Sequence, residues 1–129
     1  MRAIKLQDKA ARVGFDWPSL APVFDKMREE MAELEAELSK PERDAAAAPD
    51  AALKDEFGDL LFVMANVARH LEIDPEDALR AANQKFTRRF QHIEQRLAAA
   101  GSSPAASTLD EMDALWNEAK AKEKSYQQS

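Results

Sequence analysis

Two acidic clusters on helix-forming segments constrain this chain more than any other feature. The first reads EEMAE and begins at Glu29, and the second reads EFGD and ends at Asp59. Within each cluster two acids stand three residues apart, so that they lie on one face of an α-helix. These pairs are Glu30 with Glu33, and Glu56 with Asp59. Each helix is therefore expected to present a pair of carboxylates to one point.

The apolar residues around the clusters recur at helical spacing and form one stripe on each segment. The stripes are Val23, Met27, Met31, Leu34 and Leu38 on the first segment, and Leu53, Phe57, Leu60, Met64, Val67 and Leu71 on the second. At about 100° per residue, Glu30 and Glu56 lie at the margins of these stripes, whereas Glu29 points furthest away. If the stripes pack together, four carboxylates meet at the seam between them.

Carboxylates that share a half-buried site need a cation, because desolvation and mutual repulsion both oppose their ionised forms. An all-oxygen set of ligands suits a hard divalent ion such as Mg²⁺, for which Mn²⁺ could substitute. For any single glutamate a solvated helix face is the better interpretation. A di-iron carboxylate bundle requires Glu-x-x-His on two helices. Val67 and Arg89 stand three residues before the two histidines, so the spacing excludes that class.

The rest of the chain also reads as helix and predicts an all-α fold. Glycine is scarce and alanine abundant, which favours helix. Helices are expected over residues 1–13, 19–39, 50–71, 75–99 and 108–122, with a loop over 41–50 and a frayed polar tail after Lys122. The length of 129 residues fits a single domain over 1–129, with part of its core completed in an oligomer.

Composition excludes several classes of function. The formal net charge of −6 argues against a nucleic-acid polymer as the main partner, because duplex binding needs a basic surface. The absence of cysteine excludes disulfides and thiolate metal sites. There is no apolar run long enough to span a bilayer and no apolar core of a signal peptide. We therefore expect a cytoplasmic protein with no membrane association.

Two local features predict contacts that helical periodicity does not explain. The loop Phe15-Asp16-Trp17-Pro18 could be a lid or a base-stacking surface, although the usual burial of aromatic residues favours packing at one end of the core. Gly58 lies inside the second acidic helix, where glycine destabilises the helix by about 1 kcal/mol relative to alanine. It predicts close approach by another backbone or by a ligand.

Cations and an aromatic follow on the later helices. Lys85 and Arg89 lie along one flank of the 75–99 helix, and Asn83 lies on the other. Beside a Mg²⁺ site the two cations read as a phosphate clamp. The alternative is that they form salt bridges with acidic residues of the tail. Trp116 and Lys120 stand four residues apart on the last helix, and could add an aromatic and a cation to the same pocket.

With these residues placed, the chain resembles a known family. EExxE followed by ExxD is typical of the all-α nucleotide pyrophosphohydrolases, and the runs KAARVGFDWP, EFGDLLFVMANVARHL and ANQKFTRRF are similar to the MazG family. The similarity covers nearly the whole chain. Bacterial MazG proteins often carry two such domains, and this chain resembles only the C-terminal one. We expect either a short member or a domain of a longer protein.

The resemblance implies a homodimer or a dimer of dimers and Mg²⁺-dependent cleavage of nucleoside triphosphates to monophosphate and pyrophosphate. It implies that the metal ligands are Glu30, Glu33, Glu56 and Asp59, and that the phosphate contacts are Lys85 and Arg89. Trp116 and Lys120 match substrate-side residues, and we add Asn83 to the candidate substrate-binding set. Glu29 or Glu33 is the candidate catalytic base. The alternative function is a non-catalytic helical module that binds nucleotides or a protein.

Overall fold

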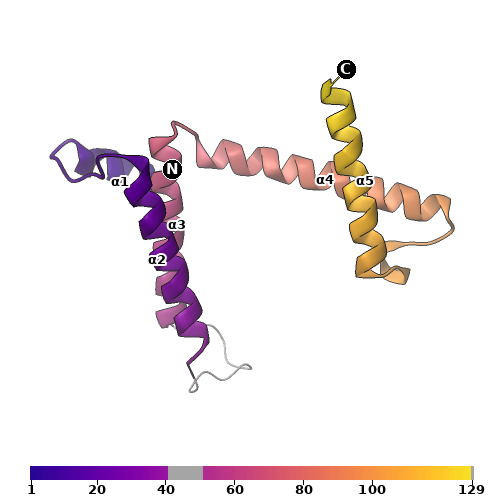
Figure 1. The fold of residues 1–129 in the computed structure, drawn as a ribbon, viewed down its shortest axis with the longest axis horizontal. Coiled ribbons are helices and arrows are strands. Elements are labelled where there is room, and N and C mark those ends of the chain that lie inside the picture. The colour runs from indigo at the N-terminus through magenta and orange to yellow at the C-terminus, as the bar shows by residue number, and fades with distance from the viewer. Residues whose placement is uncertain (41–50, 129) are drawn as a thin grey trace. The chain divides into compact units, whose positions relative to one another are not determined.

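The computed structural model describes residues 1–40 and 51–128, with side chains up to Ser125. The predicted loop over 41–50 lies outside the described residues. The described part contains helices and no strand, which confirms the all-α prediction (Figure 1). The helices are α1 (Arg2–Ala11), α2 (Leu20–Leu38), α3 (Ala51–His70), α4 (Pro75–Ala99), the short 3-10 helix η1 (Pro104–Ala106) and α5 (Leu109–Gln128).

Local sequence signals mark several of the helix ends. Asp74 Oδ1 accepts a hydrogen bond of 3.0 Å from the backbone N–H of Glu76, so Asp74 caps α4. Thr108 Oγ1 accepts one of 3.1 Å from the N–H of Glu111 and caps α5 in the same way. Gly14 follows the end of α1 with a φ of 91°, a left-handed conformation that glycine adopts without steric strain. Ser19 precedes α2 but makes no side-chain cap.

The structure divides into two compact units, Met1–Asp77 and Ala78–Ser129, and each is described by itself. In the N-terminal unit α2 and α3 pack side by side, and α1 packs on α3 (Figure 1). Val23 and Ala65 are buried between these helices, together with Gln7, whose Nε2 donates a hydrogen bond of 2.9 Å to the carbonyl of Phe62. The packing of α2 on α3 brings the two acidic segments together.

In the C-terminal unit α5 crosses α4 (Figure 1). Ile93 and Leu97 from α4 and Ala119 from α5 are buried there. Ion pairs flank these apolar residues, because Glu118 accepts contacts from His92, Arg96 and Lys122 at 3.2, 3.1 and 3.7 Å. The helix α5 continues to Gln128, so the chain stays helical beyond Lys122, where the sequence predicts a frayed tail.

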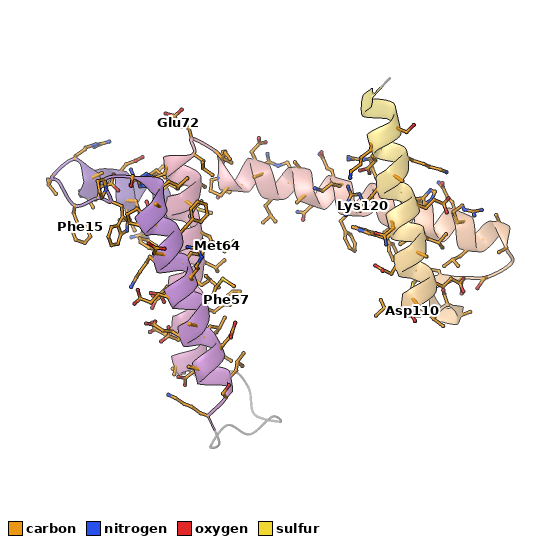
Figure 2. The ribbon with its side chains drawn as sticks, in the orientation of Figure 1. Phe15, Phe57, Met64, Glu72, Asp110 and Lys120 are labelled. Atoms are coloured by element: carbon orange, nitrogen blue, oxygen red, sulfur yellow. The ribbon has the colours of Figure 1, made fainter. Side chains whose placement is uncertain are left out.

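The predicted apolar stripes are only partly covered. Phe57 and Met64 of α3 are 52% and 50% exposed, and Leu71, which directly follows α3, is 47% exposed, although periodicity predicts all three as inward (Figure 2 labels Phe57 and Met64). Leu79, Phe86 and Leu109 in the later helices are exposed as well. The reason is geometric. Each apolar stripe is wider than the contact made by one packed helix, so a single neighbouring helix covers only one side of it.

Gly58 and the two histidines each have a defined environment in the structure, and the apolar segments have defined lengths. A Cβ atom at Gly58 would meet no atom of the described residues within 4 Å, so no backbone from this part of the chain approaches it. Nε2 of His70 lies 3.3 Å from Oδ1 of Asp16, and Nε2 of His92 lies 3.2 Å from Oε1 of Glu118. Among the described helices we find no stretch long and apolar enough to cross a membrane.

Candidate metal centre

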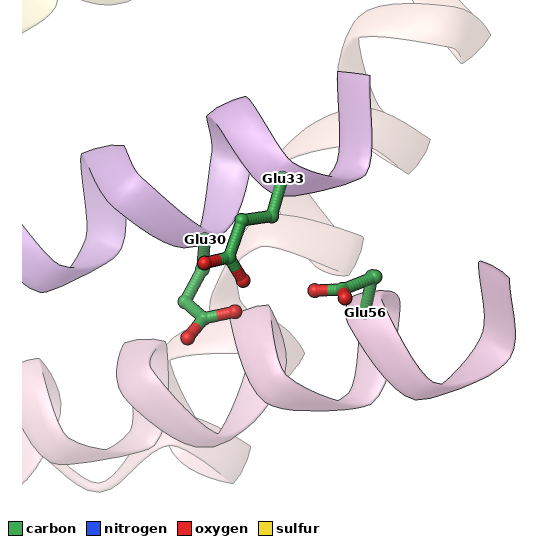
Figure 3. A group of neighbouring side chains, drawn as sticks. All are labelled: Glu30, Glu33 and Glu56. Carbon is green, nitrogen blue, oxygen red and sulfur yellow. The ribbon is translucent and has the colours of Figure 1, made fainter. Parts of the chain in front are cut away.

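Three carboxylates converge where α2 packs on α3. Glu30 and Glu33 project from α2 and Glu56 from α3, and one oxygen of each lies within 4.8 Å of the others (Figure 3). The i, i+3 spacing on α2 places the first two side chains on one face, and the packing of α3 supplies the third. Three of the four metal ligands predicted from sequence therefore meet at one point.

Buried oxygen atoms without partners make this cluster unusual. Glu30 is only 5% exposed, and neither its Oε2 nor Oε2 of Glu56 has a hydrogen-bond partner among the described residues. A buried carboxylate oxygen without a donor is unfavourable, since desolvation is not compensated. A divalent cation between these oxygens would satisfy them, and the donor set is all oxygen, as Mg²⁺ prefers. The residues present therefore fit the predicted ion.

Lys26 of α2 is in direct contact with the cluster. Its Nζ lies 3.2 Å from Oε1 of Glu29 and 3.3 Å from Oε1 of Glu30. Burial raises the pKa of Glu30, the hydrogen bond from Lys26 opposes that increase, and the charges of Glu33 and Asp59 add to it. The ionised form of Glu30 is therefore disfavoured in spite of its contact with Lys26.

The other two predicted acids occupy different positions. The side chain of Glu29 is 56% exposed and contacts Lys26, outside the group of three. Asp59 is exposed and does not belong to the group either, yet it is close enough to raise the pKa of Glu30. Asp59 as a metal ligand and Glu29 as a catalytic base stay predictions.

The predicted substrate-side residues belong to the C-terminal unit. Asn83, Lys85 and Lys120 are exposed to solvent. Arg89 is bonded to Glu123, with Nη2 lying 2.8 Å from Oε2. The structure thus shows the salt bridge to the tail that the sequence offers as an alternative role for Arg89. Sequence reasoning did not single out Glu123, although its distance of seven residues from Trp116 places both on one face of a helix.

The N-terminal unit also contains a cavity of about 460 Å³, a size typical of small-molecule sites. Its lining combines apolar, aromatic and amide side chains: Leu6, Gln7, Ala10, Gly14, Phe15, Asp16, Trp17, Lys26, Phe62, Val63, Asn66 and Arg69. Phe15 and Trp17 are 81% and 44% exposed, so among the described residues they line the cavity and do not close one end of the core. The α1 residues and Asn66 were missed, because helical periodicity does not reveal which polar residues face a cavity.

Ionic contacts hold the aromatic loop against α3. Asp16 accepts a short hydrogen bond from Arg69, and the Oδ1 of Asp8 lies 3.5 Å from Nη1 of the same arginine. The hydrogen bond from Arg69 is the main cause that lowers the pKa of Asp16, with burial acting in the opposite direction. The walls of the cavity are therefore fixed by residues from α1, the loop and α3.

Comparison with known proteins agrees with these features. Residues 21–94 match the MazG nucleotide pyrophosphohydrolase domain. The matched residues extend from the first turn of α2 into α4, and they include every acidic residue of the cluster. The chain belongs to this family.

Three curated relatives are between 37% and 51% identical to the chain over the regions that match. The chain is 43% identical to a nucleoside triphosphate pyrophosphohydrolase of Escherichia coli over 123 residues, which are 95% of this chain and 45% of the relative. It is 37% identical over 118 residues to the nucleoside triphosphate pyrophosphohydrolase/pyrophosphatase MazG of Thermotoga maritima, covering 92% of this chain and 42% of the relative. It is 51% identical over 72 residues to the uncharacterized protein YabN of Bacillus subtilis, covering 56% of this chain and 15% of the relative. The chain spans less than half the length of all three.

Proposed function

We propose that this chain hydrolyses nucleoside triphosphates at the α–β phosphate bond and that the reaction depends on Mg²⁺. The observation that carries the proposal is the group formed by Glu30, Glu33 and Glu56, with two buried oxygens that lack partners. Membership of the MazG family and the names of the Escherichia coli and Thermotoga maritima relatives support the substrate class.

Different residues of the chain would bind the metal ion, activate the water and hold the phosphates. Glu30, Glu33, Glu56 and Asp59 would hold Mg²⁺, which when bound neutralises phosphate charge and makes a coordinated water more acidic. Glu29 or Glu33 would orient or deprotonate the attacking water. Lys85 and Arg89 would hold the rest of the polyphosphate and stabilise the charge that develops on pyrophosphate as it leaves.

The cavity of the N-terminal unit is the proposed site of the nucleoside. Lys26 lines it and also contacts Glu29 and Glu30, so the cavity adjoins the acidic cluster. Trp17 offers an aromatic face, and Gln7 and Asn66 offer amide groups of the kind that pair with base edges. A triphosphate that starts in the cavity would place its first phosphates beside the carboxylates.

Replacing the aromatic wall tests this placement. Trp17→Ala should raise KM for the preferred triphosphate roughly 10-fold, because stacking of a base on an aromatic ring contributes about 1–3 kcal/mol. The affinity for Mg²⁺ should not change. Val13→Ala is the control, since Val13 is exposed on the neighbouring turn and does not line the cavity. An unchanged KM for Trp17→Ala, measured by steady-state kinetics, would remove the nucleoside from this cavity.

The exposed apolar residues support self-association. Phe57, Leu61 and Met64 of α3 are about half exposed, and contiguous apolar surface of this kind marks an interaction site. We expect a homodimer or a dimer of dimers at low micromolar concentration in sedimentation velocity experiments. Leu61→Glu should shift the boundary toward the monomer. A wild-type protein that sediments only as a monomer would contradict the proposal.

Turnover separates the enzyme from a non-catalytic nucleotide-binding module. A panel of triphosphates incubated with Mg²⁺ should be consumed, and chelation of the metal should abolish consumption until Mg²⁺ is restored. Thermal stabilisation by Mg²⁺ and nucleotide without any turnover would favour the regulatory module instead.

A further inference from the structure

Three cations of α4 act on one carboxylate of α5. Arg89 donates from Nε to Oε1 and Oε2 of Glu123 at 3.3 and 3.2 Å, and from Nη2 to Oε2 at 2.8 Å. The hydrogen bond from Arg89 is the largest cause that lowers the pKa of Glu123; burial opposes it, and the charges of Arg88 and Lys85 add to it. An ionised Glu123 therefore lies among the cations proposed to bind phosphate.

The guanidinium of Arg89 is restrained in two independent ways. Its Cζ lies 5.2 Å from the centroid of the Trp116 ring, so that the guanidinium packs on the ring, as cations do on aromatic faces. Glu123 takes the edge of the guanidinium that carries Nε and Nη2, which fixes the direction in which the group points. The side chain of Arg89 is 13% exposed, so little solvent is present to replace either contact.

One end of the guanidinium is left free by this arrangement. An arginine carries five N–H donors in a rigid planar fork. Within the part of the chain that the structure describes, Nη1 of Arg89 has no acceptor, since its hydrogen bonds all leave from Nε and Nη2. Phosphate oxygens bind such forks through two parallel hydrogen bonds. The free end is therefore suited to a phosphate group.

We propose that Glu123 is a positioning residue, which holds Arg89 against Trp116 so that its Nη1 end is presented to the polyphosphate. The inference rests on the proposed function, in which Arg89 is a phosphate contact. It differs from an ordinary ion pair between helices, and α5 supplies an example of the latter. Glu118 accepts from Arg96 at 3.1 Å, but that arginine is 52% exposed and contacts no aromatic ring that the structure describes.

Glu123→Gln tests the proposal because it keeps the shape of the side chain and removes its charge. We expect KM for the preferred triphosphate to rise roughly 10-fold, the change produced by weakening one charge-assisted hydrogen bond. The Kd of inorganic pyrophosphate, titrated calorimetrically without divalent cations, should rise by a similar factor, whereas kcat should change less than KM. Glu118→Gln is the matched control and should leave both values close to those of the wild type.

The same substitution made in an Arg89→Ala protein tests whether Glu123 acts through Arg89. A positioning residue acts only through the group it positions, so Glu123→Gln should add no further loss in an Arg89→Ala protein. If circular dichroism shows that Glu123→Gln loses helix, Glu123→Asp replaces it. The aspartate keeps the charge but withdraws the carboxylate by one methylene, and it should also raise the Kd.

Several results would overturn the proposal. These are an unchanged or lower Kd in the Glu123 variant, the same loss from Glu118→Gln, an additive loss in the Arg89→Ala background, or a wild-type protein that does not bind pyrophosphate. Failure of the wild type to hydrolyse triphosphates contradicts the proposed function separately, since the pyrophosphate titration needs no turnover.

Discussion

Glu56→Gln should abolish most of the activity while the protein stays folded. We expect kcat/KM to fall by roughly 100-fold or more, since loss of residues that merely support metal ligands already has effects of about 10- to 100-fold. The near-isosteric amide keeps the packing of α2 on α3. It also removes one charge from a cluster whose oxygens Glu30 Oε2 and Glu56 Oε2 lack donors, so the melting temperature without metal should be equal or higher.

The response to Mg²⁺ separates metal binding from folding. In the wild type Mg²⁺ should raise the melting temperature, because the ion binds only the folded arrangement of carboxylates. In Glu56→Gln that increase should be largely lost. Asp55→Asn is the matched control, since Asp55 is the preceding exposed acid on α3 and does not belong to the cluster. A folded Glu56→Gln protein with unchanged Mg²⁺ affinity in calorimetry would exclude the proposed site.

Arg89→Ala should reduce turnover more than it disturbs folding. Loss of a charged hydrogen bond to phosphate corresponds to about 1.5–3 kcal/mol, so kcat/KM should fall roughly 10- to 100-fold. Some loss of stability is also expected, because Glu123 loses its partner and the contact with Trp116 disappears. Thermal unfolding measured beside the kinetics determines how much of the loss in activity is due to unfolding.

Arg96→Ala is the comparison for this variant. It removes another ion pair between α4 and α5, that of Arg96 with Glu118, and leaves Arg89 in place. Its activity should remain near that of the wild type. If the two alanine variants lose equal activity at equal stability, Arg89 has no specific role with phosphate.

The fold was predictable where local chemistry determines it. Asp74 and Thr108 cap α4 and α5, which begin within one residue of the helix starts expected at 75 and 108, and a left-handed Gly14 follows α1, which ends two residues before the end expected at 13. The exposed side chains of Phe57 and Met64 were not predictable, since periodicity shows that a residue is apolar but does not show which element covers it. An apolar stripe that is wide enough to pack against several helices stays partly exposed until all of those helices are present.

The parts of the candidate site that depend on spacing along one helix were predictable, and the parts that depend on contacts between helices were not. Glu30, Glu33 and Glu56 meet because their positions relative to the apolar stripes follow from the sequence. The contact between Arg89 and Glu123 joins residues 34 positions apart, and the cavity joins α1 to α3. Such pairings depend on how helices cross, which the periodicity of one helix does not encode.

Identification of the reaction products tests the central claim most directly. Purified protein is incubated with Mg²⁺ and its best triphosphate substrate, and the products are separated by ion exchange with and without added inorganic pyrophosphatase. Cleavage of the α–β bond predicts nucleoside monophosphate and pyrophosphate in equal amounts, with orthophosphate formed only after pyrophosphatase is added. Nucleoside diphosphate with free orthophosphate before that addition would contradict the account.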